Sequence, residues 1–106
     1  MSNLPIHTTS PGKRALLASV LQEIPGTSGQ AQRARILEAL AQSACTSVEM
    51  IRYLDCYDAN ARLHELRHKD GHAIAMTWVQ QETEAGELHR VGLFFLDEGG
   101  SSHAQQ

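Results

Sequence analysis

The stretch Thr46–Gly71, TSVEMIRYLDCYDANARLHELRHKDG, contains two short helical patterns with a tight break between them. Thr46 and Glu49 have the spacing of a capping box, in which a hydroxyl and a carboxylate each satisfy a free backbone N–H at a helix start. After the break at 55–57, Asp58 can cap a second helix. Gly71 supplies the left-handed residue with which many helices end, so the pattern predicts both helices and their limits.

Apolar residues recur at helical spacing on both sides of the break. The apolar side of the first helix consists of Val48, Met50, Ile51 and Leu54. The apolar face of the second helix consists of Ala59, Leu63 and Leu66. The side chains that point away from this second face are Asn60, His64 and His68. Two short helices joined by so small a turn predict a helix-turn-helix motif.

Three further regions precede this motif. Residues 1–12 contain two prolines and several serines and threonines, which predicts a flexible N-terminal tail. Residues 13–25 predict an amphipathic helix, ended by Pro25-Gly26, with an apolar stripe of Leu16, Leu17, Val20, Leu21 and Ile24. This stripe either docks on the main core or forms an arm that pairs with another subunit. A third helix is predicted from Gly29 to about Ser43, with Thr27 or Ser28 as its cap.

After Gly71 the hydrophobic period changes to that of strands. Residues 72–81 and 88–96 predict two strands, and the polar loop 82–87, which contains Gly86, is suited to a hairpin. Trp78 could stack on a base or a partner, but we expect it to be a core residue, because a single Trp on a strand that faces three helices usually is. Residues 97–106 are rich in Gly and Ser and predict a flexible C-terminal tail. The predicted fold is therefore mainly α with a C-terminal β-hairpin, of the α+β class.

Length and composition limit the class of protein. A chain of 106 residues with 42% hydrophobic residues is enough for one domain with a modest core. It has no apolar run near the roughly 20 residues needed to span a bilayer, and no signal-peptide pattern, so we expect a cytoplasmic protein without membrane contact. Cys45 and Cys56 fit buried, reduced thiols. The net charge of −3 argues against strong nonspecific affinity for nucleic acid.

The segment from residue 32 to residue 96 resembles the small winged helix-turn-helix DNA-binding domains of bacterial and prophage genomes. The resemblance is carried by ARILEAL in the first helix, LDCYDANARLHELR across the turn, and GHAI at the start of the wing. It implies a domain over 27–96 with a three-helix core and a wing, to which residues 13–25 add an extra N-terminal helix. It also implies binding to double-stranded DNA, with the helix 58–69 in the major groove. The wing loop departs from the family pattern because it contains Glu82, Glu84 and Glu87 in place of basic residues.

The predicted DNA-contacting residues all lie on that recognition helix. They are Asn60, Arg62, His64, Arg67, His68 and Lys69. Asn60 can pair with adenine, and Arg62 or Arg67 with guanine, because each offers two hydrogen-bonding atoms in one plane. Lys69 adds a phosphate contact near the helix end. The alternative is a solvated helix face on which the two arginines pair with Glu65 or Asp58.

The same helix contains the sequence HELRH at 64–68, which matches the zinc-protease signature H-E-x-x-H. Helical spacing places His64 and His68 on one face, and Glu65 could act as a general base. The longer form of this motif requires a third histidine at position 74, which is isoleucine here. We therefore expect no enzymatic activity, no cofactor and no metal site, with surface metal binding by the two histidines as an incidental property.

Two functions follow from these observations. The first is a sequence-specific DNA-binding protein, a transcriptional regulator of phage or mobile-element type that acts by occupying its site. A homodimer reading two half-sites is a corollary, because a single small domain binds DNA weakly. The alternative is a winged-helix protein-interaction module, in which the acidic wing and the N-terminal stripe contact protein partners and the recognition helix reads no DNA.

Overall fold

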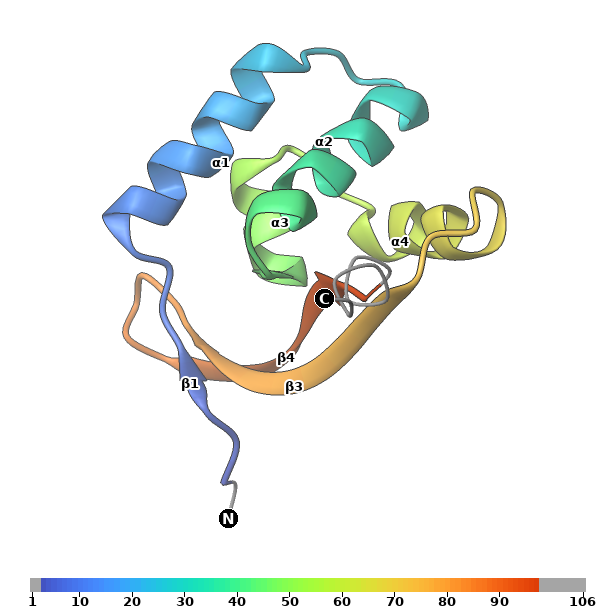
Figure 1. Cartoon of the computed structure of the whole chain (residues 1–106). Coiled ribbons are helices and arrows are strands. Elements are labelled where there is room, and N and C mark those ends of the chain that lie inside the picture. The colour runs from blue at the N-terminus through green and yellow to red at the C-terminus, as the bar shows by residue number, and fades with distance from the viewer. Residues whose placement is uncertain (1–2, 98–106) are drawn as a thin grey trace, which may run out of the picture.

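The computed structural model describes residues 3–97, which form four helices packed on one side of a small curved sheet (Figure 1). In chain order the elements are β1 (Ile6–His7), α1 (Pro11–Glu23), α2 (Gly29–Gln42), β2 (Cys45–Thr46), α3 (Ser47–Tyr53), α4 (Ala59–His68), β3 (Ile74–Glu82) and β4 (Leu88–Leu96). Helices α2, α3 and α4 followed by the β3–β4 hairpin are the three-helix core and wing of a winged helix-turn-helix. The predicted α+β fold class is confirmed.

The sheet has the strand order β1-β3-β4-β2. Strands β3 and β4 form the antiparallel hairpin, in which Trp78 lies opposite Gly92. The short strand β2 runs antiparallel to β4, and β1 runs parallel to β3 with Ile6 beside Gln80. The open end of the hairpin lies next to α4, and its tip lies near the N-terminal end of α1 (Figure 1). The start and the tip of the hairpin therefore lie against different parts of the molecule.

The helix limits follow from local hydrogen bonds. Thr46 and Glu49 form the predicted capping box, since the Glu49 N–H donates to the Thr46 hydroxyl at 3.1 Å and the Thr46 N–H donates to the Glu49 carboxylate at 2.9 Å. Ser28, one of the two predicted caps, accepts from the N–H of Ala31. Asp58 occupies the cap position of α4, but its side chain makes no capping hydrogen bond. Gly71 has a φ of 76°, as its predicted left-handed role requires.

The hydrophobic core lies between the helices and the β2 end of the sheet. Its members include Ile36, Met50, Leu54, Leu63, Leu66 and Phe94. From the stripe of α1, Leu17 and Val20 are buried in this same core, with exposed fractions of 0% and 1%. The N-terminal helix therefore docks on its own chain, which agrees with the first of the two interpretations of the stripe.

The segment before α1 differs from the flexible tail that the sequence predicts for residues 1–12. β1 pairs with β3, and the N–H of Gln80 donates to the carbonyl of Pro5 at 2.8 Å. Helix α1 begins at Pro11 rather than Lys13, because the hydroxyl of Ser10 accepts from the N–H of Lys13 and caps the helix. A strand of two residues has no periodicity to read, so its pairing becomes visible only in the folded chain. Most of the predicted C-terminal tail lies outside the described residues.

Trp78 is the second residue at which the structure differs from the prediction. It was expected in the core, but 43% of its surface is exposed. Alternation along β3 explains the difference, because neighbouring side chains point to opposite faces of a strand. Val79 and Gln81 are the buried residues in this part of the strand, at 4% and 2% exposed. Gln81 accepts a hydrogen bond from the hydroxyl of Thr46 at 2.6 Å, which holds the hairpin against the start of α3. Trp78 is thereby turned to the open face.

Candidate nucleic-acid interface

Helix α4 presents the outward side chains that the sequence predicts. Ala59, Leu63 and Leu66 are 2% exposed or less. Because these three positions face the core, Asn60 and His64 project from the opposite side and are exposed. The turn before α4 is tight: the N–H of Cys56 donates to the carbonyl of Met50 at 3.1 Å, and Asp55 has a φ of 55°. This turn fixes the angle at which α4 leaves α3.

A groove of about 470 Å³ runs between α4 and the hairpin, and we call it the α4–hairpin groove. Its α4 wall consists of Asn60, Leu63, His64 and Arg67. Its hairpin wall consists of Met76, Trp78, Arg90, Val91, Gly92 and Phe94, and Ser47 completes the lining. The lining contains two arginines and no carboxylate, so the groove carries positive charge although the whole chain is acidic. Such a groove is electrostatically suited to a polyanion.

The two arginines of the groove are held without being neutralised. The Nε of Arg67 donates to the carbonyl of Ile74 at 3.0 Å, and its guanidinium lies 5.6 Å from the ring centre of Phe94. The guanidinium of Arg90 lies 4.4 Å from the ring centre of Trp78. Within residues 3–97 neither arginine takes part in an ion pair with a carboxylate. Both positive charges therefore remain available to a bound anion.

Arg90 lies on β4 and is absent from the predicted contact residues, all of which lie on the recognition helix. The signal that could have found it is the hairpin register. Gln80 pairs with Arg90 and Trp78 pairs with Gly92, so Trp78 and Arg90 lie on the same face of two adjacent strands. The loop between the predicted strands and their alternation are both readable from the sequence, whereas their closeness to α4 is not.

Arg62 has different surroundings from the other predicted contact residues. Its Nη2 donates to Oε2 of Glu65 at 3.2 Å, and its Nε lies 3.0 Å from Oε1 of the same residue. Arg33 of α2 reaches that carboxylate as well, at 2.9 Å. A Cβ on Gly29 would lie only 2.7 Å from Nη1 of Arg62, so this side chain packs against the start of α2. This is the pairing that the alternative interpretation of the helix face described.

The HELRH segment of α4 has the helical geometry that its spacing predicts. His64 and His68 are exposed, and their ring centres lie 4.4 Å apart. Glu65, the potential general base, accepts a hydrogen bond from Arg33, which is the main reason that the pKa of this carboxyl lies below its ordinary value. Among residues 3–97, no group of three or more His, Cys, Asp or Glu residues could hold a metal ion. Position 74 is a buried isoleucine at the start of β3.

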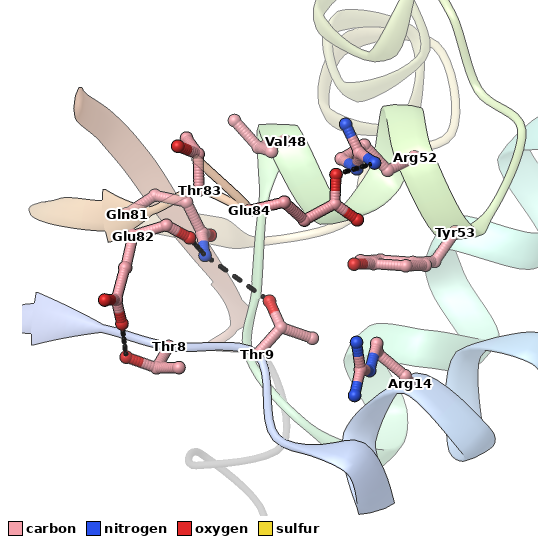
Figure 2. Close-up of a pocket in the computed structure, with 10 residues that line it drawn as sticks. All are labelled: Thr8, Thr9, Arg14, Val48, Arg52, Tyr53, Gln81, Glu82, Thr83 and Glu84. Atoms are coloured by element: carbon pink, nitrogen blue, oxygen red, sulfur yellow. Dashed lines mark hydrogen bonds and ion pairs between the residues drawn. The ribbon is translucent and has the colours of Figure 1, made fainter. Parts of the chain in front are cut away.

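The acidic hairpin tip lies at the other end of the sheet, beside α3 and the start of α1 (Figure 1). Figure 2 shows a small pocket there, in which Arg52 of α3 forms an ion pair with Glu84. The hydroxyl of Thr8 donates to Glu82 at 3.0 Å, and the amide of Gln81 donates to the hydroxyl of Thr9 at 3.4 Å (Figure 2). Glu82 is thus directed toward the N-terminal segment and Glu84 toward α3, and neither lines the α4–hairpin groove.

A buried carboxylate, Glu49 of α3, holds the N-terminal segment in place. Its side chain is 0% exposed and accepts hydrogen bonds from Thr9 at 2.6 Å and from His7 at 2.8 Å. The ammonium of Lys13 lies 3.0 Å from its other oxygen. Burial by itself raises the pKa of Glu49, but hydrogen bonds from Thr9, the Thr46 N–H, His7 and Lys13 outweigh it and lower the pKa below 4.5. The carboxylate is therefore ionised at neutral pH.

Both cysteines are free and buried, as predicted. Burial raises the pKa of the Cys45 thiol to about 11, and burial likewise raises the pKa of the Cys56 thiol. At neutral pH both are therefore thiols rather than reactive thiolates. Their role in the fold is that of small apolar side chains in the core.

Comparison with known proteins places the fold in a family. The family profile described as "Winged helix-turn-helix domain" matches residues 31–99, well over half of the chain. The protein belongs to this family of winged helix-turn-helix domains. Searches of curated proteins and of solved structures find no significant match. The family points to DNA as the partner, and such domains are typically non-enzymatic. No helix within residues 3–97 is long and apolar enough to cross a membrane.

Proposed function

We propose that this protein is a sequence-specific DNA-binding protein that regulates transcription, of phage or mobile-element type, and acts in the cytoplasm by occupying its site. The observation that carries the proposal is the α4–hairpin groove. Arg67 of α4 and Arg90 of β4 line this groove, and neither arginine has a carboxylate partner among the described residues. The recognition helix would lie in the major groove, which is wide enough to admit an α-helix.

The distribution of charge supports this proposal despite the net charge of −3. Two acidic residues are engaged elsewhere, since Glu49 is buried against Lys13 and Glu84 pairs with Arg52 at the hairpin tip. Asp58, at the start of α4, is exposed and makes no capping hydrogen bond. Glu65 lies on α4 itself but is held by Arg33 on the α2 side. Long-range repulsion from the remaining acidic residues is screened within about 8–10 Å at physiological salt. An approaching phosphate is therefore affected mainly by the nearby positive charges of Arg67 and Arg90.

Each predicted contact residue receives a role in the proposal. Asn60 reads adenine and Arg67 reads guanine, since a carboxamide and a guanidinium can each make two hydrogen bonds to one purine. His64 lies between them on the groove wall, while His68 and Lys69 at the exposed end of α4 contact phosphates. Arg62, which packs against α2, supports the position of the helix. Two copies binding two half-sites would supply the affinity that one small domain lacks.

The experiment is a selection from a random duplex pool, followed by fluorescence anisotropy on the selected sequence at two salt concentrations. We expect a consensus sequence, and Arg67→Ala should weaken binding roughly tenfold or more, the loss expected for one bidentate base contact. Arg14→Ala is the matched control, because it removes the same charge from an exposed residue in the pocket at the hairpin tip. The proposal fails if no sequence is enriched, or if an Arg62→Ala, Arg67→Ala double variant binds as well as the parent.

The alternative function, a protein-interaction module, was based on two surfaces, the N-terminal stripe and the acidic hairpin tip, and the first of these is not available. Leu17 and Val20 of the N-terminal stripe are in the core and cannot form a docking face. The acidic tip, its second surface, stays accessible, because Glu84 is 63% exposed although it pairs with Arg52. Weak binding that is the same for every sequence and disappears at high salt would favour this alternative over sequence-specific recognition.

A further inference from the structure

The pocket at the hairpin tip is bounded by segments that are distant from one another in the sequence (Figure 2). The N-terminal segment with α1, helix α3, and residues 81–84 of the hairpin each form part of its lining. Its volume is about 180 Å³, and a water molecule takes up about 30 Å³ in the liquid. The pocket therefore has room for a molecule of roughly six to ten non-hydrogen atoms, smaller than a drug-sized ligand.

Two charged side chains of opposite sign in this lining have no partner of opposite charge. Within residues 3–97, neither Arg14 of α1 nor Glu82 of β3 takes part in an ion pair. Figure 2 shows these two side chains on opposite sides of the pocket, so they do not neutralise each other. The other two charged residues of the lining, Arg52 and Glu84, do form an ion pair. The lining is therefore neutral as a whole but offers one unpaired cation and one unpaired anion.

The part of the lining next to Arg14 contains a hydroxyl donor and an apolar surface. The ring of Tyr53 lies beside Arg14, and its hydroxyl is directed into the pocket (Figure 2). A phenolic O–H can donate to a carboxylate, so Tyr53 and Arg14 together suit a small anionic group. Val48 adds an apolar side chain to the wall that α3 forms.

The side of the pocket that carries Glu82 is held by hydrogen bonds to the N-terminal segment. The hydroxyl of Thr8 donates to Glu82 at 3.0 Å. The hydroxyl of Thr9 donates to the buried carboxylate of Glu49 at 2.6 Å, and the amide of Gln81 donates to Thr9 at 3.4 Å. These contacts fix the N-terminal segment beside the hairpin, so the groups on this side are in position before a ligand arrives.

We infer that this pocket binds a free α-amino acid, with the ligand's carboxylate on Arg14 and the Tyr53 hydroxyl and its ammonium on Glu82. A guanidinium can give a carboxylate two parallel N–H bonds, and an ammonium forms charge-assisted hydrogen bonds with a carboxylate. A ligand with only one of these charges would leave Arg14 or Glu82 without a partner. An amino acid carries both charges on a molecule that fits the volume, and its side chain can contact Val48 and the ring of Tyr53. The ligand site is separate from the α4–hairpin groove and does not depend on DNA binding.

The test is a titration of the isotope-labelled full chain with each of the standard L-amino acids in turn, followed by two-dimensional NMR. The expected result is that at least one amino acid binds and shifts the signals of residues that line the pocket. For that amino acid, N-acetylation of the ammonium or amidation of the carboxylate should each weaken binding about tenfold or more, the factor expected for a hydrogen bond to a charged group. Arg14→Ala and Glu82→Gln should weaken binding by a similar factor, and the glutamine keeps an acceptor for Thr8.

Glu87→Gln is the matched control, because it removes one exposed carboxylate near the hairpin tip that does not line the pocket. Thermal melting first establishes that each variant is folded. The inference is overturned if no amino acid binds, if the N-acetylated form binds as tightly as the free amino acid, or if Glu87→Gln loses as much affinity as Glu82→Gln. The titrations contain no DNA, so each of these outcomes leaves the proposed DNA binding to its own experiment.

Discussion

The ammonium of Lys13 lies 3.0 Å from the carboxylate of Glu49, and the two side chains are 13% and 0% exposed. This pair joins the first turn of α1 to the first turn of α3. His7 and Thr9 bind the same carboxylate, so the whole N-terminal segment is attached to the helix-turn-helix through one buried charge. The extra N-terminal elements are thus part of the domain structure and not an appendage.

Removing the Glu49 carboxylate should strongly destabilise the protein. Glu49→Ala removes the buried carboxylate that the partly buried side chains of Lys13, His7 and Thr9 share, and breaking a buried ion pair typically costs about 3–5 kcal/mol. Urea denaturation followed by circular dichroism measures the loss. Glu23→Gln on the exposed side of α1 is the control and should change stability by less than about 0.5 kcal/mol. Equal stabilities for the two variants would show that the buried cluster contributes nothing.

The same carboxylate should make stability depend on acid pH. The pKa of Glu49 in the folded protein lies below 4.5, its value in the unfolded chain, so the unfolded chain takes up the proton first as pH falls. The stabilisation is complete above about pH 4.5 and is lost as pH falls through the lowered pKa. Thermal melting between neutral and acid pH should show this decline, and Glu49→Gln should flatten it. An unchanged profile in that variant would assign the decline to other groups.

Two glycines should respond to alanine with opposite signs. Gly71 has a φ of 76°, so alanine there is strained by about 1 kcal/mol even though open space surrounds the position. Gly12 lies in the first turn of α1, and a Cβ added there would meet no atom within 4 Å. Alanine at position 12 should therefore stabilise the protein by about 0.5 kcal/mol. Melting temperatures of the two variants decide the matter, and a shift in the same direction would contradict the backbone argument.

The packing of the apolar residues that line the α4–hairpin groove should depend on Gly92. Gly92→Ala forces a methyl group against Met76 and Phe94 and should cost about 1–3 kcal/mol. The Met76→Ala, Gly92→Ala double variant should recover part of this loss, because alanine at position 76 removes one of the two side chains that the new methyl group would meet. A double-variant cycle by urea denaturation measures the recovery. Strictly additive losses would mean that the clash with Met76 is unimportant.

Much of the fold was readable because its signals are local. The capping box of Thr46 and Glu49 and the left-handed Gly71 are set by residues close to one another in the chain. The strand limits 88–96 also follow from a short segment rich in Val, Leu and Phe. The candidate site was only partly readable: exposure of Asn60 and His64 follows from helical period, but the surroundings of Arg62 and Arg90 include other elements.

The sequence by itself determined the order of the helices, the hairpin and the outward face of α4, because hydrophobic period and capping act between near neighbours in the chain. Tertiary structure alone decided that β1 joins the sheet, that Trp78 is exposed, and that Arg90 faces α4 across a groove. These features depend on which distant segments of the chain come into contact. They also depend on whether an arginine then lies beside a carboxylate or beside an aromatic ring. For Arg62 that partner is Glu65, and for Arg90 it is Trp78.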